Sequence, residues 1–366
     1  MSTLTSTLVT GVVVGVRGNV ESVGTFTVND VILCGDELLH KRINTTVPST
    51  PLSGPKDQHI LLVSGLKFGS AGSPMAPSQL FSAQLLADFV AGRMCTGAGD
   101  DSSLPAGIVK VIVAGNSVVD SSVLSKDKAA NAKQQAAAVL PLAQLDMFLA
   151  QLLASCPVDV LPGDSDPSSI NFPQQPLHPC LLPHSVRFKN GLHLATNPYE
   201  TNVTPAEPAD MAGGNLRVIG HSGKPLTDIA WQTTATADSE PVAADSASMD
   251  VTDTAESAVS AGARYLSMLE NTVKWGNLCP TAPDSLPCYP LCDRDPFVLD
   301  LGNSGETSAP PGVVFAGNAP AFASSLFESK DKAHKTRVVC VPAFHLTRQA
   351  VLVNINTLDT HVLTFE

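Results

Sequence analysis

Short continuous apolar runs, each followed by a glycine turn, recur through the first half of the chain. They lie at residues 59–64, 108–114 and 158–161. An apolar run of this length that is bounded by a turn is typical of a buried strand. In the segments 77–91 and 126–155, by contrast, Leu, Phe and Ala recur at helical spacing. This alternation predicts a βαβαβ unit built around a buried parallel sheet.

Two residues should interrupt the helical segments. Gly92 follows the first segment directly, and we expect it to end that helix. Pro141 lies inside the second segment, and we expect a kink or a break there. Proline lacks the backbone N–H that a helix needs, and its ring clashes with the preceding turn.

The second half of the chain continues the pattern with further strand-like runs and a helical segment at residues 260–275. Because these runs come after the first βαβαβ unit, we expect them to form a second sheet. They lie at residues 191–195, 216–220, 313–317, 337–342 and 351–354.

The N-terminal segment has a different pattern. Runs rich in β-branched residues at 8–16, 24–28 and 31–33, separated by Gly and Asn turns, predict three short strands. Three strands alone leave one face of their sheet uncovered, so they either pack on the next domain or belong with strands farther upstream. The polar, proline-rich residues 37–58 predict a linker.

The charge of the chain limits its partners. A net charge of −12 argues against wide, unassisted contact with DNA phosphates, which requires clustered Lys and Arg. Residues 232–258 hold acids, Ala, Ser and Thr but no Lys or Arg. Such a segment buries too little apolar surface to offset the entropy of ordering, so we expect a disordered acidic insertion. No apolar run is long enough to cross a bilayer, so we expect no membrane partner.

The eight cysteines are scattered along the chain, several of them within apolar runs. This pattern predicts reduced, mostly buried thiols. Cys279, Cys288 and Cys292 lie close together in sequence and raise the question of a zinc site. They form no Cys-x-x-Cys pair and have no His nearby, so we expect no zinc there.

Polar residues follow the ends of the predicted strands, which is where open α/β sheets bind ligands. This pattern of strands and glycine turns resembles the calcineurin-like metallophosphoesterases. In that family the turns supply carboxylates, imidazoles and an amide, which hold two metal ions and activate a water. At the matching positions this chain has Gly65, Lys67, Asn116, Asp164, Ser165, His221, Asn318 and Pro320.

The resemblance implies that this site is degenerate. Gly65 and Lys67 stand where the family has an aspartate and a histidine, and an ammonium group at Lys67 would repel both metals. Asn116 replaces the bridging carboxylate, which removes a negative charge. We therefore expect no catalytic residue, no bound metal and no cofactor.

Three possible metal ligands remain, Asp164, Asp166 and His221, and three remnants do not make a dinuclear centre. For the two aspartates we weigh a residual metal site against a structural role. An aspartate just after a glycine such as Gly163 more often braces a turn, so we favour the structural interpretation.

Longer motifs are similar to those of the second, small (B-type) subunits of eukaryotic replicative DNA polymerases. The resemblance runs from about residue 8 to the C-terminus, and the Pro-Gln-Gln-Pro-Leu-His motif at 173–178 favours polymerase delta. The other motifs lie at 61–66, 158–163, 196–198, 280–290, 295–297 and 315–318.

The resemblance implies an α/β fold in two parts. Residues 1–50 would form a partial OB-fold β-barrel, of which only the later strands are matched, so that the upstream strands are missing. Residues 51–366 would form an inactivated phosphoesterase-like β-sandwich flanked by helices. The acidic insertion at 232–258 departs from the family.

The resemblance also implies a function. The chain would be a non-catalytic scaffold subunit in the nucleus, binding the cysteine-rich C-terminal domain of the polymerase delta catalytic subunit and an elongated third subunit. Contact with DNA would be indirect or weak, since residues 1–36 offer one aromatic, Phe26, and one basic residue, Arg17. The alternatives are the equivalent small subunit of another replicative polymerase and a residual metal-dependent phosphoesterase.

The proline-rich segment 280–290 suggests a site of partner contact. A rigid loop with an aromatic anchor suits a protein interface, while packing in the core is the competing interpretation. The candidate contact residues are Pro283, Asp284, Tyr289, Asp295 and Pro296.

Overall fold

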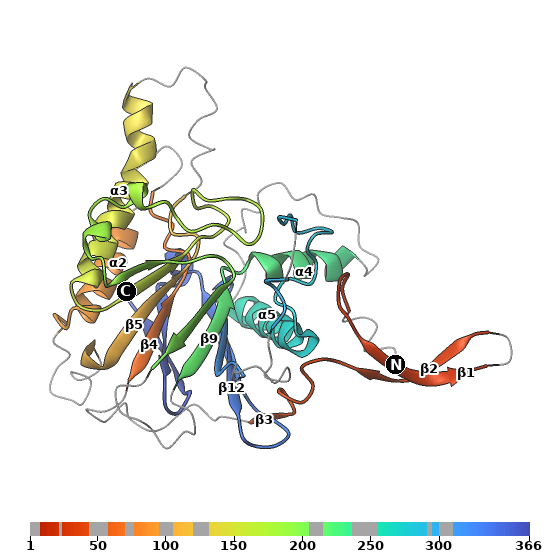
Figure 1. Cartoon of the computed structure of the whole chain (residues 1–366). Helices are drawn as coiled ribbons and strands as arrows, with labels where there is room; N and C mark the ends of the chain where they lie inside the picture. The colour runs from red at the N-terminus through yellow and green to blue at the C-terminus, as the bar shows by residue number, and fades with distance from the viewer. Residues whose placement is uncertain are drawn as a thin grey trace.

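Two six-stranded sheets form the body of the molecule, as the computed structural model in Figure 1 shows. A separate two-stranded hairpin lies near the N-terminus. The structure describes residues 8–21, 24–43, 58–69, 77–94, 105–119, 132–204, 215–235, 255–290, 295–299 and 310–366.

The first sheet contains the predicted βαβαβ unit. Its strands β4, β5, β6 and β7 run parallel, and β13 pairs antiparallel with β4. In spatial order the strands are β14 (Thr360–Thr364), β13 (Gln349–Asn354), β4 (His59–Val63), β5 (Ile108–Ala114), β6 (Val158–Leu161) and β7 (Leu192–Leu194).

The second sheet is mixed. Strands β9, β10 and β12 run parallel, whereas β8 and β11 pair antiparallel with their neighbours. In spatial order the strands are β3 (Lys41–Ile43), β11 (Ala323–Glu328), β12 (Lys335–Pro342), β10 (Val313–Ala319), β9 (Leu216–His221) and β8 (Tyr199–Val203).

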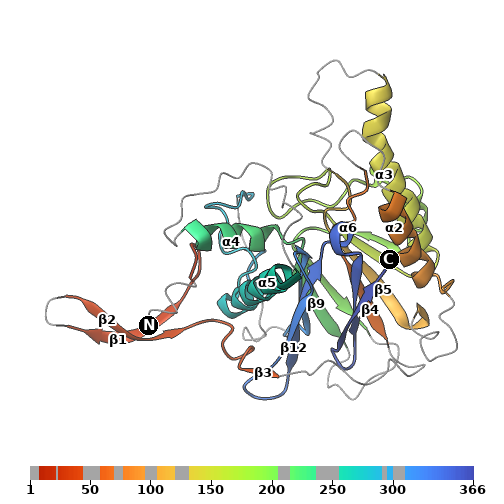
Figure 2. The ribbon, with the colours of Figure 1, turned by 180° about the vertical axis from the view of Figure 1, so that it is seen from behind.

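Helices cover the outer faces of both sheets (Figures 1 and 2). Helices α2 (Pro77–Val90) and α3 (Ala132–Leu153) lie on the first sheet, and α4 (Lys224–Ala235) and α5 (Ala255–Trp275) lie on the second. The remaining helices are short: α6 (Phe344–Thr347) and the 3-10 turns η2 (Pro105–Gly107), η4 (Pro179–Leu181) and η5 (Ser185–Arg187).

Side-chain alternation along the strands explains this layering. In β4, Leu61 and Val63 join the cluster that includes α2 and α3, whereas Ile60 and Leu62 face the other sheet. Successive strand residues point to opposite faces, so a strand that is apolar at every position is buried on both. Phe315 of β10 lies in the same layer between the sheets. The molecule is therefore an α/β sandwich flanked by helices, as predicted.

The assignment of strands to sheets was partly wrong. We expected the runs at 191–195 and 351–354 in the second sheet, but β7 and β13 belong to the first. Pairing between distant strands depends on the connections between them, which periodicity does not reveal. The described residues also form four strands that the pattern did not predict: β3, β8, β11 and β14.

The N-terminal strands also differ from the prediction. The described residues form a hairpin, β1 (Gly15–Val20) with β2 (Phe26–Ile32), so one strand covers the two runs expected at 24–28 and 31–33. The expected linker at 37–58 is wrong in its first part. Leu38 and Leu39 are buried in the core, and β3 joins the second sheet by pairing with β11. The OB-fold assignment of residues 1–50 stays a prediction.

Two further expectations concern helices. Helix α2 matches the predicted span. Helix α3 passes through Pro141 as one continuous helix, so the break considered there is wrong, whereas the kink stays a prediction. The predicted disordered insertion at 232–258 is wrong at its ends, where α4 continues to Ala235 and α5 begins at Ala255. Residues 236–254 lie outside the described residues.

Candidate functional site

The carboxyl ends of the parallel strands of both sheets meet at one edge of the sandwich. In the first sheet, the N–H of Gly65 after β4 donates to the carbonyl of Gly115 after β5, at 2.9 Å. Asn318, near the end of β10, connects the two sheets. Its Nδ2 donates to the carbonyl oxygens of Ala114 at 3.3 Å and Ser222 at 2.8 Å. The structure thus brings together most of the predicted degenerate positions.

Asp166 has the most hydrogen bonds of the candidate residues. Its buried carboxylate accepts from the N–H groups of Ser117 at 2.7 Å, Val118 at 2.9 Å and Gly163 at 2.8 Å. Burial raises the pKa of Asp166 to about 6, while these backbone hydrogen bonds act in the opposite direction. The prediction that an aspartate after Gly163 braces a turn is confirmed for Asp166.

The residues just before Asp166 also form polar contacts with other loops. The N–H of Ser165 donates to Asn116 Oδ1 at 3.2 Å, and the Ser165 hydroxyl donates to the Val118 carbonyl at 2.7 Å. Asp164 is exposed and forms an ion pair with Lys224 Nζ at 3.0 Å. The predicted positions Asn116 and Ser165 therefore join the loops after β5 and β6 to each other.

Gly65 permits the close approach of Asn318. Its φ is +63°, and a Cβ atom at this position would lie 2.5 Å from Asn318 Oδ1. The backbone of Asn318 is held in place as well, since its N–H donates to Ser64 Oγ at 2.9 Å. An aspartate in place of Gly65 would occupy the space that Asn318 fills. Pro320, the other candidate at this turn, is half-buried just after β10.

Lys67 lies beside an imidazole that the sequence did not single out. His345 of α6 has its Nδ1 3.0 Å from the carbonyl oxygen of Gly65. Burial and the positive charge of Lys67 lower the pKa of His345 to about 4, against the smaller opposing effect of the Gly65 hydrogen bond. A neutral His345 therefore donates this hydrogen bond at neutral pH.

His221, the one imidazole kept from the family pattern, does not join Asp164 and Asp166. It is fully buried, and its Nδ1 accepts from the N–H of Gly223 at 3.0 Å. By strand alternation it shares the side of Ile219, which packs in the cluster with α4 and α5. Burial lowers the pKa of His221 to about 3, so the ring is neutral.

The backbone at three candidate positions is unusual. Lys67, Asn116 and Asn318 have φ values of 45°, 53° and 54°, in the left-handed region that non-glycine residues rarely adopt. Such outliers concentrate at functional sites. Within the described residues, however, no group of three or more His, Cys, Asp or Glu side chains is placed to hold a metal ion.

Comparisons with known proteins match almost the whole chain. The family model for the B subunit of DNA polymerases alpha and epsilon matches residues 60–324. The DNA polymerase delta small subunit of Oryza sativa subsp. japonica is 32% identical, over 98% of this chain and 68% of that protein. That of Saccharomyces cerevisiae is 31% identical, over 98% of this chain and 66% of that protein.

The chain belongs to the B-subunit family of DNA polymerases. The predicted resemblance to the polymerase delta small subunits is confirmed, because the similar proteins carry that name. Membership in this family makes the chain a DNA polymerase subunit with a role in DNA replication. Across the described residues, no helix is long and apolar enough to span a membrane.

Two of the family motifs form a buried polar network that our reasoning from single residues missed. Asn197 Nδ2 donates to Gln174 Oε1 and to Ser222 Oγ, each at 2.7 Å, and the Ser222 N–H donates to Asn197 Oδ1 at 3.2 Å. The network joins the loops after β6, β7 and β9. The motifs at 173–178 and 196–198 were the only sequence signal for it, and neither predicts that its residues meet.

The partner-contact candidates of the chain lie on loops outside the strand ends. Four are exposed, and the half-buried Asp295 accepts from the N–H of Phe297 at 2.8 Å. The loop is braced, since the Ser285 hydroxyl donates to Asp228 at 2.6 Å and the Tyr289 N–H donates to the carbonyl of Phe172 at 2.8 Å. The exposed candidates are Pro283, Asp284, Tyr289 and Pro296.

The cysteine cluster is only partly described. Cys279 is buried and Cys288 half-buried, and both are free thiols. Burial raises the pKa of Cys279, and nearby carboxylates of Asp295 and Asp228 act in the same direction. Cys292 lies outside the described residues.

Proposed function

We propose that this chain is the non-catalytic accessory subunit of nuclear DNA polymerase delta. It acts as a scaffold that bridges the cysteine-rich C-terminal domain of the catalytic subunit and the third subunit. The observation that carries this proposal is the closure of the strand-end loops by hydrogen bonds within the chain. The Asp166 carboxylate and the Asn318 amide are both engaged by backbone groups.

The electrostatics of the loops support a non-catalytic role. A dinuclear metal site needs negative or neutral ligands with free lone pairs. Here two ammonium groups, Lys67 and Lys224, lie at the strand ends, and Lys224 pairs with the exposed Asp164. His221, a neutral imidazole, is buried on the helix side of the second sheet. A dinuclear hydrolytic centre would have to displace these interactions.

The net charge of −12 supports indirect or weak contact with DNA. The names of the relatives favour polymerase delta over the alternative that the chain serves another replicative polymerase. The braced, partly exposed loop around Tyr289 is the surface that we assign to partner contact, because a rigid loop loses little entropy on binding.

Co-purification tests the proposal directly. This chain is expressed with the host's polymerase delta catalytic subunit and third subunit, and the purified material is assayed for manganese-dependent phosphodiesterase activity. We expect a stable 1:1:1 complex, with hydrolysis no higher than that of a preparation carrying Asp164→Ala. Hydrolysis that Asp164→Ala abolishes would establish the phosphoesterase instead. A chain that binds neither subunit would refute the scaffold.

A further inference from the structure

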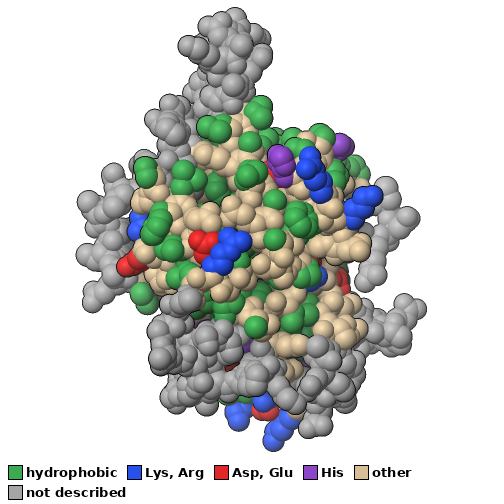
Figure 3. Space-filling model, turned by 90° about the vertical axis from the view of Figure 1, so that its left-hand side faces the viewer, with side chains coloured by type: hydrophobic (Ala, Val, Ile, Leu, Met, Phe, Trp, Pro, Cys, Tyr) green, Lys and Arg blue, Asp and Glu red, His purple; other side chains and the backbone are tan. Residues whose placement is uncertain are grey.

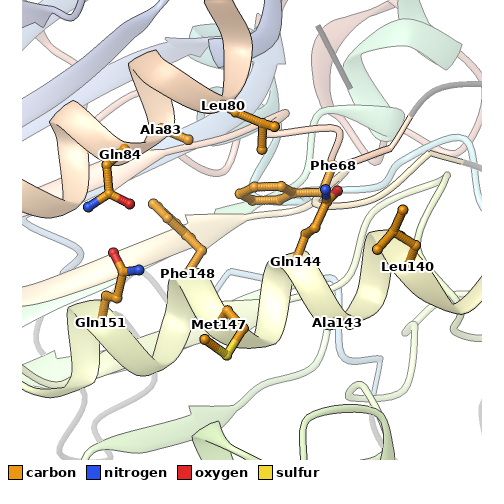
Figure 4. Close-up of a pocket in the computed structure, with 10 residues that line it drawn as sticks. All are labelled: Phe68, Leu80, Ala83, Gln84, Leu140, Ala143, Gln144, Met147, Phe148 and Gln151. Carbon is orange, nitrogen blue, oxygen red and sulfur yellow. The ribbon is translucent and has the colours of Figure 1, made fainter. Parts of the chain in front are cut away.

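A groove runs between α2 and α3 on the outer face of the first sheet, far in the fold from the loops around Tyr289. Its cavity volume is about 340 Å³, and Figure 4 shows the side chains that line it. None of its ten lining residues is charged: seven are apolar and three are glutamines. The surrounding face shows hydrophobic side chains among few charged ones (Figure 3).

Apolar side chains along α3 remain in water at this groove. Leu140 is 47% exposed and Met147 is 53% exposed. With Gln144 and Gln151 they recur at i, i+4, i+7 and i+11, which places all four on one face of α3. This face extends over about 16 Å, or three helical turns. Phe81 of α2, 58% exposed, adds apolar surface on the neighbouring helix.

Two polar atoms on this face lack partners. The Oε1 atoms of Gln144 and Gln151 are buried, and neither has a hydrogen-bond partner within the described residues. Leaving a buried acceptor unpaired is costly, and native proteins rarely do so. The two glutamines lie seven residues apart, about 10 Å along the helix axis. A second helix lying along the groove would present side chains at the same interval.

We propose that this groove binds an amphipathic α-helix of a partner subunit of the polymerase. The apolar face of that helix packs on Leu140, Met147 and Leu80. Uncharged donors such as Asn, Gln or Ser, two turns apart, pair with Gln144 and Gln151 once these side chains turn their amide oxygens into the groove. A helix laid into an apolar groove buries residues at i, i+3, i+4 and i+7. Charge complementarity favours a neutral face, because an ion placed there would find no counter-charge. The identity of the partner rests on the function proposed above.

Hydrogen exchange on the intact complex tests the groove. Amide exchange is compared between the free chain and its complex with the catalytic and third subunits, for peptides covering residues 80–87 and 140–151. We expect slower exchange of both peptides in the complex. Met147→Asp puts a charge into the groove and should weaken the binding of one subunit at least about tenfold. Val259→Asp, at an exposed apolar position of α5, should leave binding unchanged.

A second variant separates recognition from folding. Gln144→Met removes an unpaired buried acceptor, so it should raise the Tm of the free chain while weakening the binding of the same subunit. If the complex forms, neither peptide exchanges more slowly in it and Met147→Asp leaves binding unchanged, this inference is wrong while the proposed scaffold function stands. A free chain that dimerises, and that Met147→Asp makes monomeric, would show a second copy as the occupant and overturn it too. Failure to bind either subunit would overturn both proposals.

Discussion

Single residues at the strand-end loops differ sharply in what they contribute, even when they are neighbours in sequence. Asp164 is exposed and pairs with Lys224, whereas Asp166 is buried and receives three backbone N–H groups. An exposed ion pair contributes little to stability because water and salt screen it. A buried carboxylate that satisfies several backbone donors contributes much more.

We predict that Asp166→Ala destabilises the chain by roughly 3 kcal/mol or more, because it leaves three backbone donors without an acceptor. Urea denaturation of the purified chain measures this loss. Asp164→Ala is the matched control, with an expected change of less than about 1 kcal/mol. Equal effects of the two substitutions would contradict the role assigned to Asp166.

The buried His221 should make folding sensitive to acid. Its pKa is about 3 in the folded chain and about 6.5 when unfolded, so the unfolded state binds an extra proton between these values. This uptake stabilises the unfolded state as the pH falls through 6.5. We expect it to remove about 2 kcal/mol of stability between pH 7 and pH 5.

His221→Asn tests this assignment. The asparagine side chain offers Gly223 an acceptor but does not titrate, so the drop in unfolding free energy from pH 7 to pH 5 should shrink by about 2 kcal/mol. The difference between variant and parent isolates His221 from Asp166, whose raised pKa acts in the opposite direction over this range. His345 is unchanged in both proteins. An unaltered pH dependence in the variant would show that the pKa of His221 is the same in the folded and unfolded chains and would contradict this assignment.

At the scale of elements, the ends of β4 and β10 are shaped around each other. Gly65 has a left-handed backbone, and Asn318 fills the space above it. We predict that Gly65→Asp, which puts back the family's carboxylate, destabilises the chain by roughly 3 kcal/mol through backbone strain and the clash with Asn318.

Lys67→His, which puts back an imidazole in the same turn, serves as the control. Lys67 already adopts its left-handed φ without glycine, and its side chain is half-buried. We expect a change within about 1 kcal/mol in thermal or urea unfolding. If Gly65→Asp reduced the unfolding free energy no more than Lys67→His, the loop would be able to rearrange around a larger side chain, which would contradict the close fit of Gly65 and Asn318.

How well the elements could be predicted depended on whether their signal was local. The continuous apolar run of β4 and the helical spacing of α2 are local, and both elements were found within about two residues. Pairing is not local: β13 lies beside β4 although almost 300 residues separate them, and nothing in either segment indicates this. A break at Pro141 was one of the two outcomes expected in α3, but the helix is continuous there and the proline ring packs on Gly69.

The same distinction applies to the site. Gly65, Asn116 and Asn318 were found through a family pattern that places them at strand ends, where parallel strands bring them together. The network of Gln174, Asn197 and Ser222 escaped prediction because it joins three loops by side-chain hydrogen bonds. No periodicity records which loops meet, so such contacts follow only from the folded structure.

At the scale of the whole molecule, the sandwich and the N-terminal hairpin differ in how much of their surface is buried. The sandwich buries both faces of its sheets, but the hairpin pairs only with itself among the described sheets. One face of the hairpin is polar and holds the Arg17–Asp30 ion pair at 2.8 Å. The other face is apolar and largely exposed; its cross-strand pairs are Val16–Val31, Gly18–Val28 and Val20–Phe26.

A lone two-stranded hairpin is marginal in water, so we predict that it opens independently of the sandwich. In the free chain, amides of β1 and β2 should exchange at least about a hundredfold faster than those of β4 and β5. Their exchange should also be insensitive to low urea, because local opening exposes little surface, whereas the core amides should respond strongly. If the hairpin amides were as protected as the core amides at low protein concentration, the prediction would be wrong, because another part of the same molecule would have to cover the apolar face. If they were protected at high protein concentration only, self-association would be the cause, and the hairpin of the single chain would still open independently.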